Sequence, residues 1–183
     1  MRLLALALTI VAAFAQEKTN APGQQAKPYV LLVGLDGFRY DFAQRYDVTP
    51  LLDLAQRGVS ADTLIPAYPS VTFPKFYTLV TGLTPSAHGL VSMNFYDPVR
   101  KQHFDYRTPA TRDGSWYGGT PVWVLAEKQG MRTASYFWVG SDAEIQGVRP
   151  TSYITYNATA THEDRVKQVG EWFALPRSAG RIW

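Results

Sequence analysis

Thr72 is a hydroxyl residue at a point where an irregular loop runs into a predicted helix. The loop is bounded by Pro66 and Pro69, and Pro74 fits the first helical turn, where backbone N–H groups have no partner within the helix. Those free N–H groups and the positive end of the helix dipole suit a bound phosphate or oxyanion. Two interpretations are open: Thr72 is only a helix N-cap, or it belongs to a site that binds a phosphate or an oxyanion.

Asp36 is a second candidate because it directly follows a run typical of a buried strand. Residues 29–35 are almost entirely apolar, which predicts a strand covered on both faces of a parallel sheet. Open α/β sheets bind ligands at the carboxyl ends of their strands, so a carboxylate there is suited to hold a cation. The alternative is an ordinary turn formed together with Gly37.

Both residues belong to a longer series of short motifs in a fixed order. The series is Asp36-Gly37-Phe38-Arg39, Thr72-Phe73-Pro74, Thr81-Gly82-Leu83-Thr84-Pro85-Ser86-Ala87-His88-Gly89-Leu90, Asn94-Phe95-Tyr96-Asp97-Pro98, Pro121-Val122-Trp123, Ala126-Glu127-Lys128-Gln129-Gly130 and Phe137-Trp138-Val139-Gly140-Ser141-Asp142. In order and spacing it resembles the nucleotide pyrophosphatase/phosphodiesterase family of the alkaline phosphatase superfamily. The resemblance covers roughly residues 28–175.

The resemblance implies metal-dependent hydrolysis of nucleotide phosphodiester or pyrophosphate bonds with two Zn²⁺ ions. Asp36 and Thr72 match ligands of one zinc, and Thr72 also matches the nucleophile that takes the nucleotidyl group covalently before water releases it. Asn94 matches a residue that donates a hydrogen bond to a phosphoryl oxygen, although its neighbours taken alone favour a turn. Phe73 and Tyr156 match two aromatic positions that stack on a nucleobase.

Three other residues are weighed against structural roles. Trp138 and Asp142 fit a place in the same pocket, but Trp138 fits core packing at the end of a strand equally well. His88 lies in a stretch that the family uses as a structural turn, so it is not assigned as a metal ligand.

Local signals predict the strands and helices that must position these residues. We expect strands over 29–35, 59–65 and 132–138, helices over 49–57, from Thr72 to a stop at Gly82, over 121–129 and over 161–173, a loop over 85–89, and a short hairpin within 95–106. The alternation predicts an α/β fold. In the terms of the resemblance this is an incomplete alkaline-phosphatase-like sandwich, with a mainly parallel sheet flanked by helices.

The first 27 residues look like processing and linker segments. Residues 1–15 combine a positive start, an apolar run too short to span a bilayer and a small-x-small end, which predicts a signal peptide. Residues 16–27 have the composition of a disordered linker, and residues 28–183 are expected to form the N-terminal part of a phosphodiesterase catalytic domain. We therefore expect a periplasmic or secreted protein without stable membrane insertion.

The composition of the chain limits the classes of partner that we expect it to bind. The formal net charge is +3, and the basic residues are scattered, which excludes the basic stripe that nucleic acid polymers require. The chain has no cysteine and therefore no disulfide. The expected partner is a nucleotide or another phosphodiester substrate, and the oligomeric state stays open.

The chain also departs from the family pattern. Lys75 and Phe76 stand where family members commonly carry Asn-His. The further ligands of the two zinc ions, an Asp-x-x-x-His segment, an Asp-His pair and a final His, have no counterpart before Trp183. We therefore expect an N-terminal fragment with little or no activity alone. The alternatives are an inactive secreted module that binds nucleotides, and a phosphomonoesterase or sulfatase of the same superfamily.

Overall fold

The computed structural model describes residues 19–175, so the predicted signal peptide lies outside the described residues. Its elements, in chain order, are η1 (Pro22–Gln24), α1 (Phe42–Arg45), α2 (Thr49–Arg57), α3 (Thr72–Thr81), α4 (Pro85–His88), β1 (Asn94–Asp97), β2 (Gln102–Asp105), η2 (Pro109–Arg112), η3 (Gly114–Trp116), α5 (Val122–Lys128), β3 (Ala134–Tyr136), β4 (Ser152–Ile154) and α6 (His162–Ala174). No helix in this range is long and apolar enough to cross a membrane.

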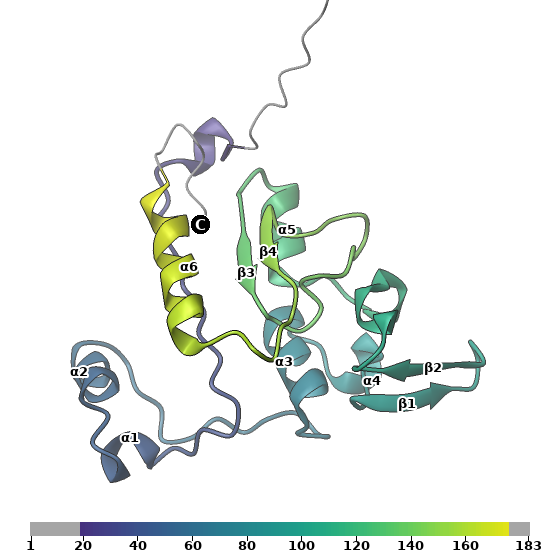
Figure 1. Cartoon of the computed structure of the whole chain (residues 1–183), viewed down its shortest axis with the longest axis horizontal. Helices are drawn as coiled ribbons and strands as arrows, with labels where there is room; N and C mark the ends of the chain where they lie inside the picture. The colour runs from purple at the N-terminus through teal and green to yellow at the C-terminus, as the bar shows by residue number, and fades with distance from the viewer. Residues whose placement is uncertain (1–18, 176–183) are drawn as a thin grey trace, which may run out of the picture.

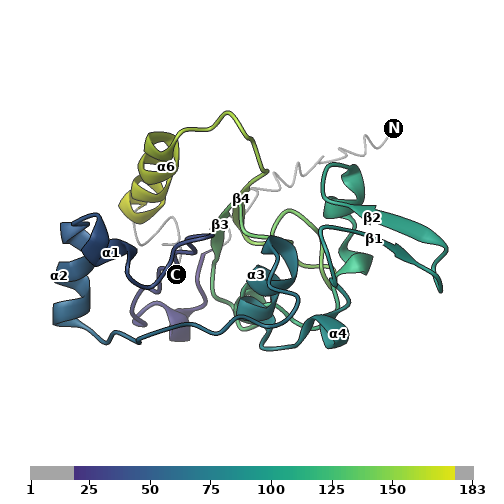
Figure 2. The same cartoon turned by 90° about the horizontal axis from the view of Figure 1, so that it is seen from below.

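In the described part of the chain, two small two-stranded sheets lie on either side of α3 (Figure 1). β1 and β2 form an antiparallel hairpin in which Asn94 pairs with Asp105. β3 and β4 pair in parallel, and α6 contacts β3. α1 and α2 lie together at the end of the molecule opposite the hairpin, joined to the rest by extended segments (Figure 2).

Glu127 of α5 joins that helix to both strands of the parallel pair. Its Oε1 accepts hydrogen bonds from the backbone N–H groups of Thr133 and Thr151, each at 2.8 Å, and from both threonine hydroxyls. Thr133 and Thr151 directly precede β3 and β4. One carboxylate thus fixes where the two strands begin relative to the helix.

Aromatic side chains form the core between α3, the hairpin and η3. Phe104 of β2 is fully buried and stacks on Phe95 at a centroid distance of 5.3 Å. Trp116 packs edge-on against the Phe104 ring at 5.5 Å, and Tyr77 of α3 packs against Tyr117 at 5.3 Å. This packing holds the hairpin against the helix that carries Thr72.

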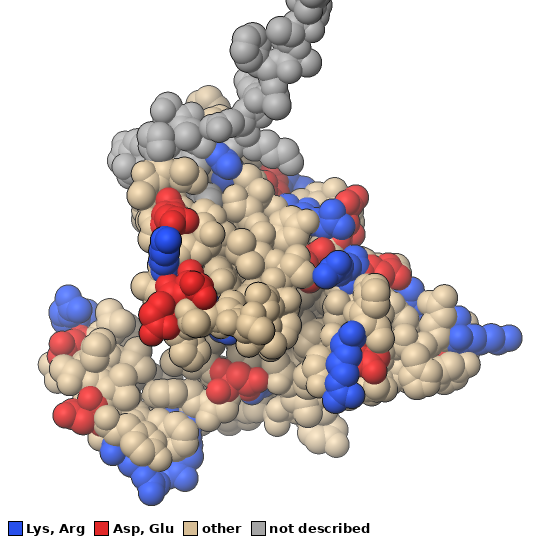
Figure 3. All heavy atoms as spheres, in the orientation of Figure 1, with Lys and Arg blue, Asp and Glu red and all other residues tan. Residues whose placement is uncertain are grey.

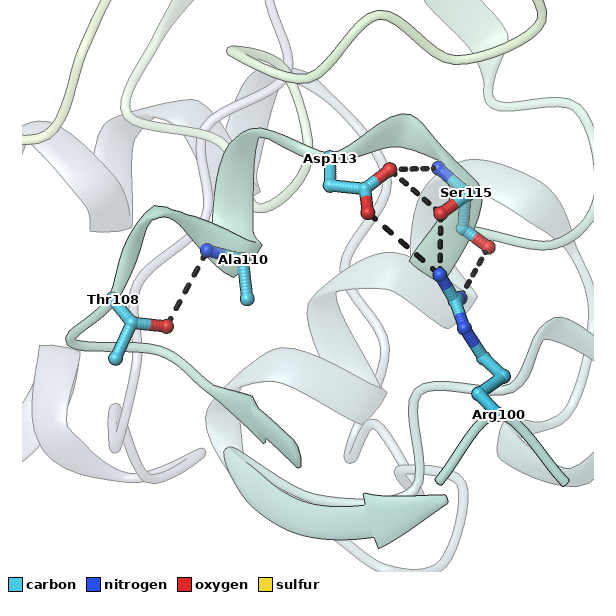
Figure 4. Close-up of polar contacts among 5 residues, drawn as sticks. All are labelled: Arg100, Thr108, Ala110, Asp113 and Ser115. Carbon is cyan, nitrogen blue, oxygen red and sulfur yellow. Dashed lines mark hydrogen bonds and ion pairs between the residues drawn. The ribbon is translucent and has the colours of Figure 1, made fainter. Parts of the chain in front are cut away.

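Arg100, in the turn between β1 and β2, binds the hairpin to the η3 segment (Figure 4). Its guanidinium donates hydrogen bonds to the Ser115 carbonyl at 2.9 Å and to Ser115 Oγ at 2.6 Å. It also lies 3.9 Å from the centroid of the Trp116 ring, and 3.7 Å separates it from Asp113 Oδ2. The hairpin is therefore held at its turn as well as along its buried face.

The predicted helices and the hairpin are confirmed, with shifted ends. α2 covers 49–57 as expected, α3 ends at Gly82, and α5 and α6 fall within or close to their predicted ranges. The predicted strand 132–138 shortens to β3, and the expected loop at 85–89 contains the short helix α4. β4 was not anticipated.

The strands predicted over 29–35 and 59–65 are wrong. Both segments are extended, but neither pairs with another strand among residues 19–175, and the large apolar side chains of 30–35 are exposed. A strand exists only where a neighbour pairs with its backbone N–H and C=O groups, and an apolar run gives no information about that neighbour.

Part of the predicted linker is docked rather than free. Asn20 is buried, the Ala21 N–H donates to the Gly130 carbonyl at 2.8 Å, and η1 follows directly. Asn20 also accepts a hydrogen bond from the Arg132 N–H next to β3. The contacts of the domain therefore begin before the predicted start at Pro28.

Candidate active site

Asp36 and Thr72, separated by 36 residues in the chain, meet through a direct hydrogen bond. The Thr72 hydroxyl donates to Asp36 Oδ2 at 2.8 Å. The other carboxylate oxygen, Oδ1, lies 2.6 Å from the Lys75 ammonium. The carboxylate thus has one partner on each oxygen, and both partners come from the first turn of α3.

The local structure explains why Thr72 points to Asp36. Thr72 is the first residue of α3, and the N-cap position is Val71, whose extended backbone has φ −92° and ψ 162°. No side chain caps this helix start, so the Thr72 hydroxyl is used for Asp36 and not for a helical N–H. The N-cap interpretation of Thr72 does not hold. On the other side, Gly37 has φ +68°, which turns the chain directly after Asp36 and is accessible to glycine at low cost.

The hydrogen bond from Lys75 favours the ionised form of Asp36. The Lys75 ammonium, with a smaller contribution from the Thr72 hydroxyl, lowers the pKa of the Asp36 carboxyl below its usual value, against a smaller opposing effect of burial. Asp36 is therefore ionised at neutral pH. The sequence shows Lys75 only as a departure from the family pattern, because its pairing with Asp36 depends on a long-range contact that the spacing of residues does not reveal.

The side chains of Asn94 and Phe73 both contact residues of the β1–β2 hairpin. The Asn94 side-chain amide donates to Asp105 Oδ2 at 3.0 Å across the hairpin, so its described partner is a carboxylate and not Thr72. Phe73, next to Thr72, packs edge-on against Phe104 at 5.9 Å and lies 6.1 Å from the ring of Tyr106. The face of α3 that bears Phe73 therefore packs against β2 and the residues that follow it.

Tyr156 lies among different residues from Phe73. Its ring is 5.1 Å from that of Phe137 and its side chain is 68% exposed. The Arg165 guanidinium of α6 lies 4.9 Å from the Phe137 ring. No described contact joins Phe73 to Tyr156, so the base-stacking role of the pair stays a prediction.

Trp138 and His88 have structural partners. The Trp138 indole N–H donates a hydrogen bond at 3.2 Å to the backbone carbonyl of Phe76 in α3. His88 is buried, its Nδ1 accepts from the Leu90 N–H at 3.2 Å, and its Nε2 lies 3.0 Å from Thr78 Oγ1. Burial lowers the pKa of His88, so the neutral ring is favoured. Burial also disfavours the charged form of Asp142, and for this carboxyl the result is a raised pKa.

The donor types at the site fit a zinc ion, but their number does not. Asp36 and Thr72 offer carboxylate and hydroxyl oxygens, whereas a zinc ion takes about four donors. Within residues 19–175 no group of three or more His, Cys, Asp or Glu residues is placed to hold a metal ion. The described residues therefore do not by themselves form the two-zinc site that the resemblance implies.

The surface has no stripe of one charge on the face shown in Figure 3. Acidic side chains gather over α6 together with a basic one, and a group of basic side chains lies at the lower left, over α1.

Comparison with known proteins identifies a family. Residues 30–182 match the family described as type I phosphodiesterase / nucleotide pyrophosphatase. A pyrophosphatase/phosphodiesterase of Schizosaccharomyces pombe is 42% identical over 149 residues, which is 80% of this chain and 31% of that protein. Human ectonucleotide pyrophosphatase/phosphodiesterase family member 1 is 37% identical over 160 residues, 86% of this chain and 17% of the human protein. The chain thus spans less than a third of the length of either relative.

Solved structures confirm the expected fold class. Murine ectonucleotide pyrophosphatase/phosphodiesterase 5 superposes with a TM-score of 0.77 at 30% identity, covering 82% of this chain and 40% of that one. An inactive threonine-to-alanine variant of the same murine protein, in complex with AMP, gives a TM-score of 0.78 at 30% identity over 82% of this chain and 41% of the murine chain. The α/β arrangement is therefore that of an alkaline-phosphatase-like domain, of which this chain covers less than half.

Proposed function

The chain belongs to the type I phosphodiesterase/nucleotide pyrophosphatase family, and we propose that its site hydrolyses nucleotide phosphodiester or pyrophosphate bonds with Thr72 as the nucleophile. The observation that carries the proposal is the 2.8 Å hydrogen bond from Thr72 to Asp36 at the start of α3. This bond joins Thr72 and Asp36, the two residues for which the sequence predicts a role in binding or catalysis. The inactivity of the threonine-to-alanine variant of the murine neighbour supports a threonine in this role.

In the proposed reaction, Thr72 Oγ1 attacks the phosphorus of the substrate. A bond forms between this oxygen and the nucleotidyl group while the phosphorus–oxygen bond to the leaving group breaks. The hydroxyl proton passes to water, and the leaving oxygen departs as an anion or takes a proton from water. Water then hydrolyses the threonine ester and releases the nucleotide. Asp36 orients the attacking hydroxyl, and the unpaired N–H groups at the start of α3 favour the negative phosphoryl oxygens.

The hydroxyl of Thr72 needs further activation. A threonine hydroxyl is a weak nucleophile at neutral pH, and the lowered pKa of Asp36 makes that carboxylate a weak base. A metal ion supplies such activation by lowering the pKa of an oxygen bound to it. Two Zn²⁺ ions belong to the proposal on the basis of resemblance, with Asp36 and Thr72 as two ligands of one ion.

A nucleotide is the proposed substrate, with AMP in the murine neighbour as supporting observation. Asn94 is proposed to donate a hydrogen bond to a phosphoryl oxygen, and Phe73 and Tyr156 to stack on the base. A secreted or periplasmic location is proposed from the signal-like residues 1–15 and from relatives named as ectonucleotide enzymes and venom phosphodiesterases.

Hydrolysis of p-nitrophenyl thymidine monophosphate by the purified chain, with Zn²⁺ supplied, tests the proposal. The chain is used at high concentration, because little activity is expected of it alone. Thr72→Ala is expected to lower the rate by about a hundredfold or more, because it removes the attacking oxygen. Thr81→Ala, a change of the same type at the other end of α3, is the matched control and should keep most of the activity. Measurable hydrolysis at equal rates by wild type and Thr72→Ala would refute the nucleophile. AMP binding without turnover would favour the nucleotide-binding module.

A further inference from the structure

The ammonium group of Lys75 lies next to the Asp36 carboxylate, which is also the predicted metal ligand. Lys75 lies three residues after Thr72 on α3, so both side chains leave the same face of the helix. Its Nζ is 2.6 Å from Asp36 Oδ1, and the side chain is only 24% exposed while that of Asp36 is 46% exposed. The ammonium also lies 5.5 Å from the centroid of the Phe76 ring. Lys75 is thus held against the carboxylate by its surroundings.

Both oxygens of Asp36 are in use within this arrangement. Oδ2 accepts the Thr72 hydroxyl, and Oδ1 holds the ammonium. A divalent cation that binds Asp36 through Oδ1 meets the ammonium that already lies 2.6 Å from this oxygen. At this range the cation and the positive charge of Lys75 repel each other. Metal binding is therefore opposed as long as the Lys75 side chain keeps this position.

We propose that Lys75 is an internal counter-cation that competes with zinc for Asp36 and so lowers the affinity of this site for metal. The proposal rests on the assignment of Asp36 as a metal ligand in the proposed function. It adds that the chain carries its own occupant for that carboxylate. Replacement of Lys75 by a neutral residue should raise zinc affinity, whereas replacement by another cation should not.

The size of the effect follows from the partial exposure of the pair. A half-exposed ion pair contributes little net free energy, since water already solvates both charges. Loss of the competing cation is therefore expected to tighten zinc binding by about fivefold, which corresponds to about 1 kcal/mol.

Titration of the purified 183-residue chain with Zn²⁺ alone, in competition with a chromogenic zinc chelator, measures this directly. The variants are Lys75→Met, which keeps the length and helix propensity of the side chain, and Lys75→Arg, which keeps the charge. Asp36→Asn in both the wild-type and the Lys75→Met background measures zinc bound elsewhere, for example by the exposed residues His103 and His162. Circular dichroism verifies that each variant is folded.

The proposal expects tighter zinc binding in Lys75→Met by about threefold or more, near wild-type binding in Lys75→Arg, and loss of the gain when Asp36→Asn is added. A smaller gain in Lys75→Met would overturn it, as would a gain that survives Asp36→Asn. So would a lack of zinc binding in both proteins, because Lys75 would then not be what opposes the metal. The readout is metal binding and not turnover, so failure of the Thr72 hydrolysis test leaves this result interpretable by itself.

Discussion

Replacement of Glu127 by alanine is expected to be among the most destabilising single changes in the described part of the chain. Glu127 Oε1 accepts four hydrogen bonds, each of 2.8 Å, from the backbone N–H and hydroxyl groups of Thr133 and Thr151. Alanine leaves two partly buried N–H groups without an acceptor, at a cost of about 1–3 kcal/mol each. We expect a loss of about 3–4 kcal/mol, or about 10 °C in melting temperature.

Urea and thermal denaturation followed by circular dichroism measure this loss. Glu127→Gln keeps an oxygen that can take the place of Oε1 and should cost only about 1–2 kcal/mol. Glu144→Ala is the matched control, because Glu144 is an exposed glutamate whose ion pair with Arg149, at 3.3 Å, is expected to contribute less than about 1 kcal/mol. If Glu127→Ala were no less stable than Glu144→Ala, the role given to this carboxylate would be refuted.

Three further predictions concern the hairpin, the core and the substrate site. Arg100→Met should cost about 1–2 kcal/mol in urea denaturation, because the bonds to Ser115 are lost, and Arg57→Met, on exposed α2, should cost less than half of that. Burial lowers the pKa of His88 in the folded protein below its unfolded value of 6.5, so the unfolded chain binds more protons. The contribution of the neutral ring to stability is therefore present above pH 6.5 and should fall as the pH drops below that value. In His88→Gln the melting temperature should depend less on pH between about pH 7.5 and pH 5.5. Phe73→Leu should weaken AMP binding about tenfold in calorimetry, since stacking on a base contributes about 1–3 kcal/mol. It should also lower the melting temperature, because the Phe73 ring packs against Phe104; unchanged affinity in the folded variant would remove Phe73 from the site.

Local signals predicted the helices well because those signals act within a few residues. The range of α2 is as expected and Gly58 follows its end, although its N-cap is Val48 and Thr49 is already its first residue. Gly82 ends α3 with φ +68°, the left-handed conformation typical of a glycine at this place. Gly130 follows α5 in the same way with φ +80°. The run 29–35 has equally clear apolar character, but pairing depends on a partner that no local pattern describes.

The candidate site shows the same division between local and long-range information. Position in the chain indicated Thr72 and Asp36 separately, and the resemblance placed them at one ion; the structure brings them together by a direct hydrogen bond. The pairing of Lys75 with Asp36 and the bonds of Glu127 to two threonine residues require the folded chain. Neither could be derived from residue types and spacing alone.

The most direct test of the central claim is a search for the covalent intermediate. The purified chain is mixed with p-nitrophenyl thymidine monophosphate and Zn²⁺, quenched in acid, and digested for mass spectrometry. We predict a nucleotidyl group on the peptide that contains Thr72, absent from the same peptide of Thr72→Ala. Release of p-nitrophenolate by both proteins, with that peptide unmodified in each, would contradict the account.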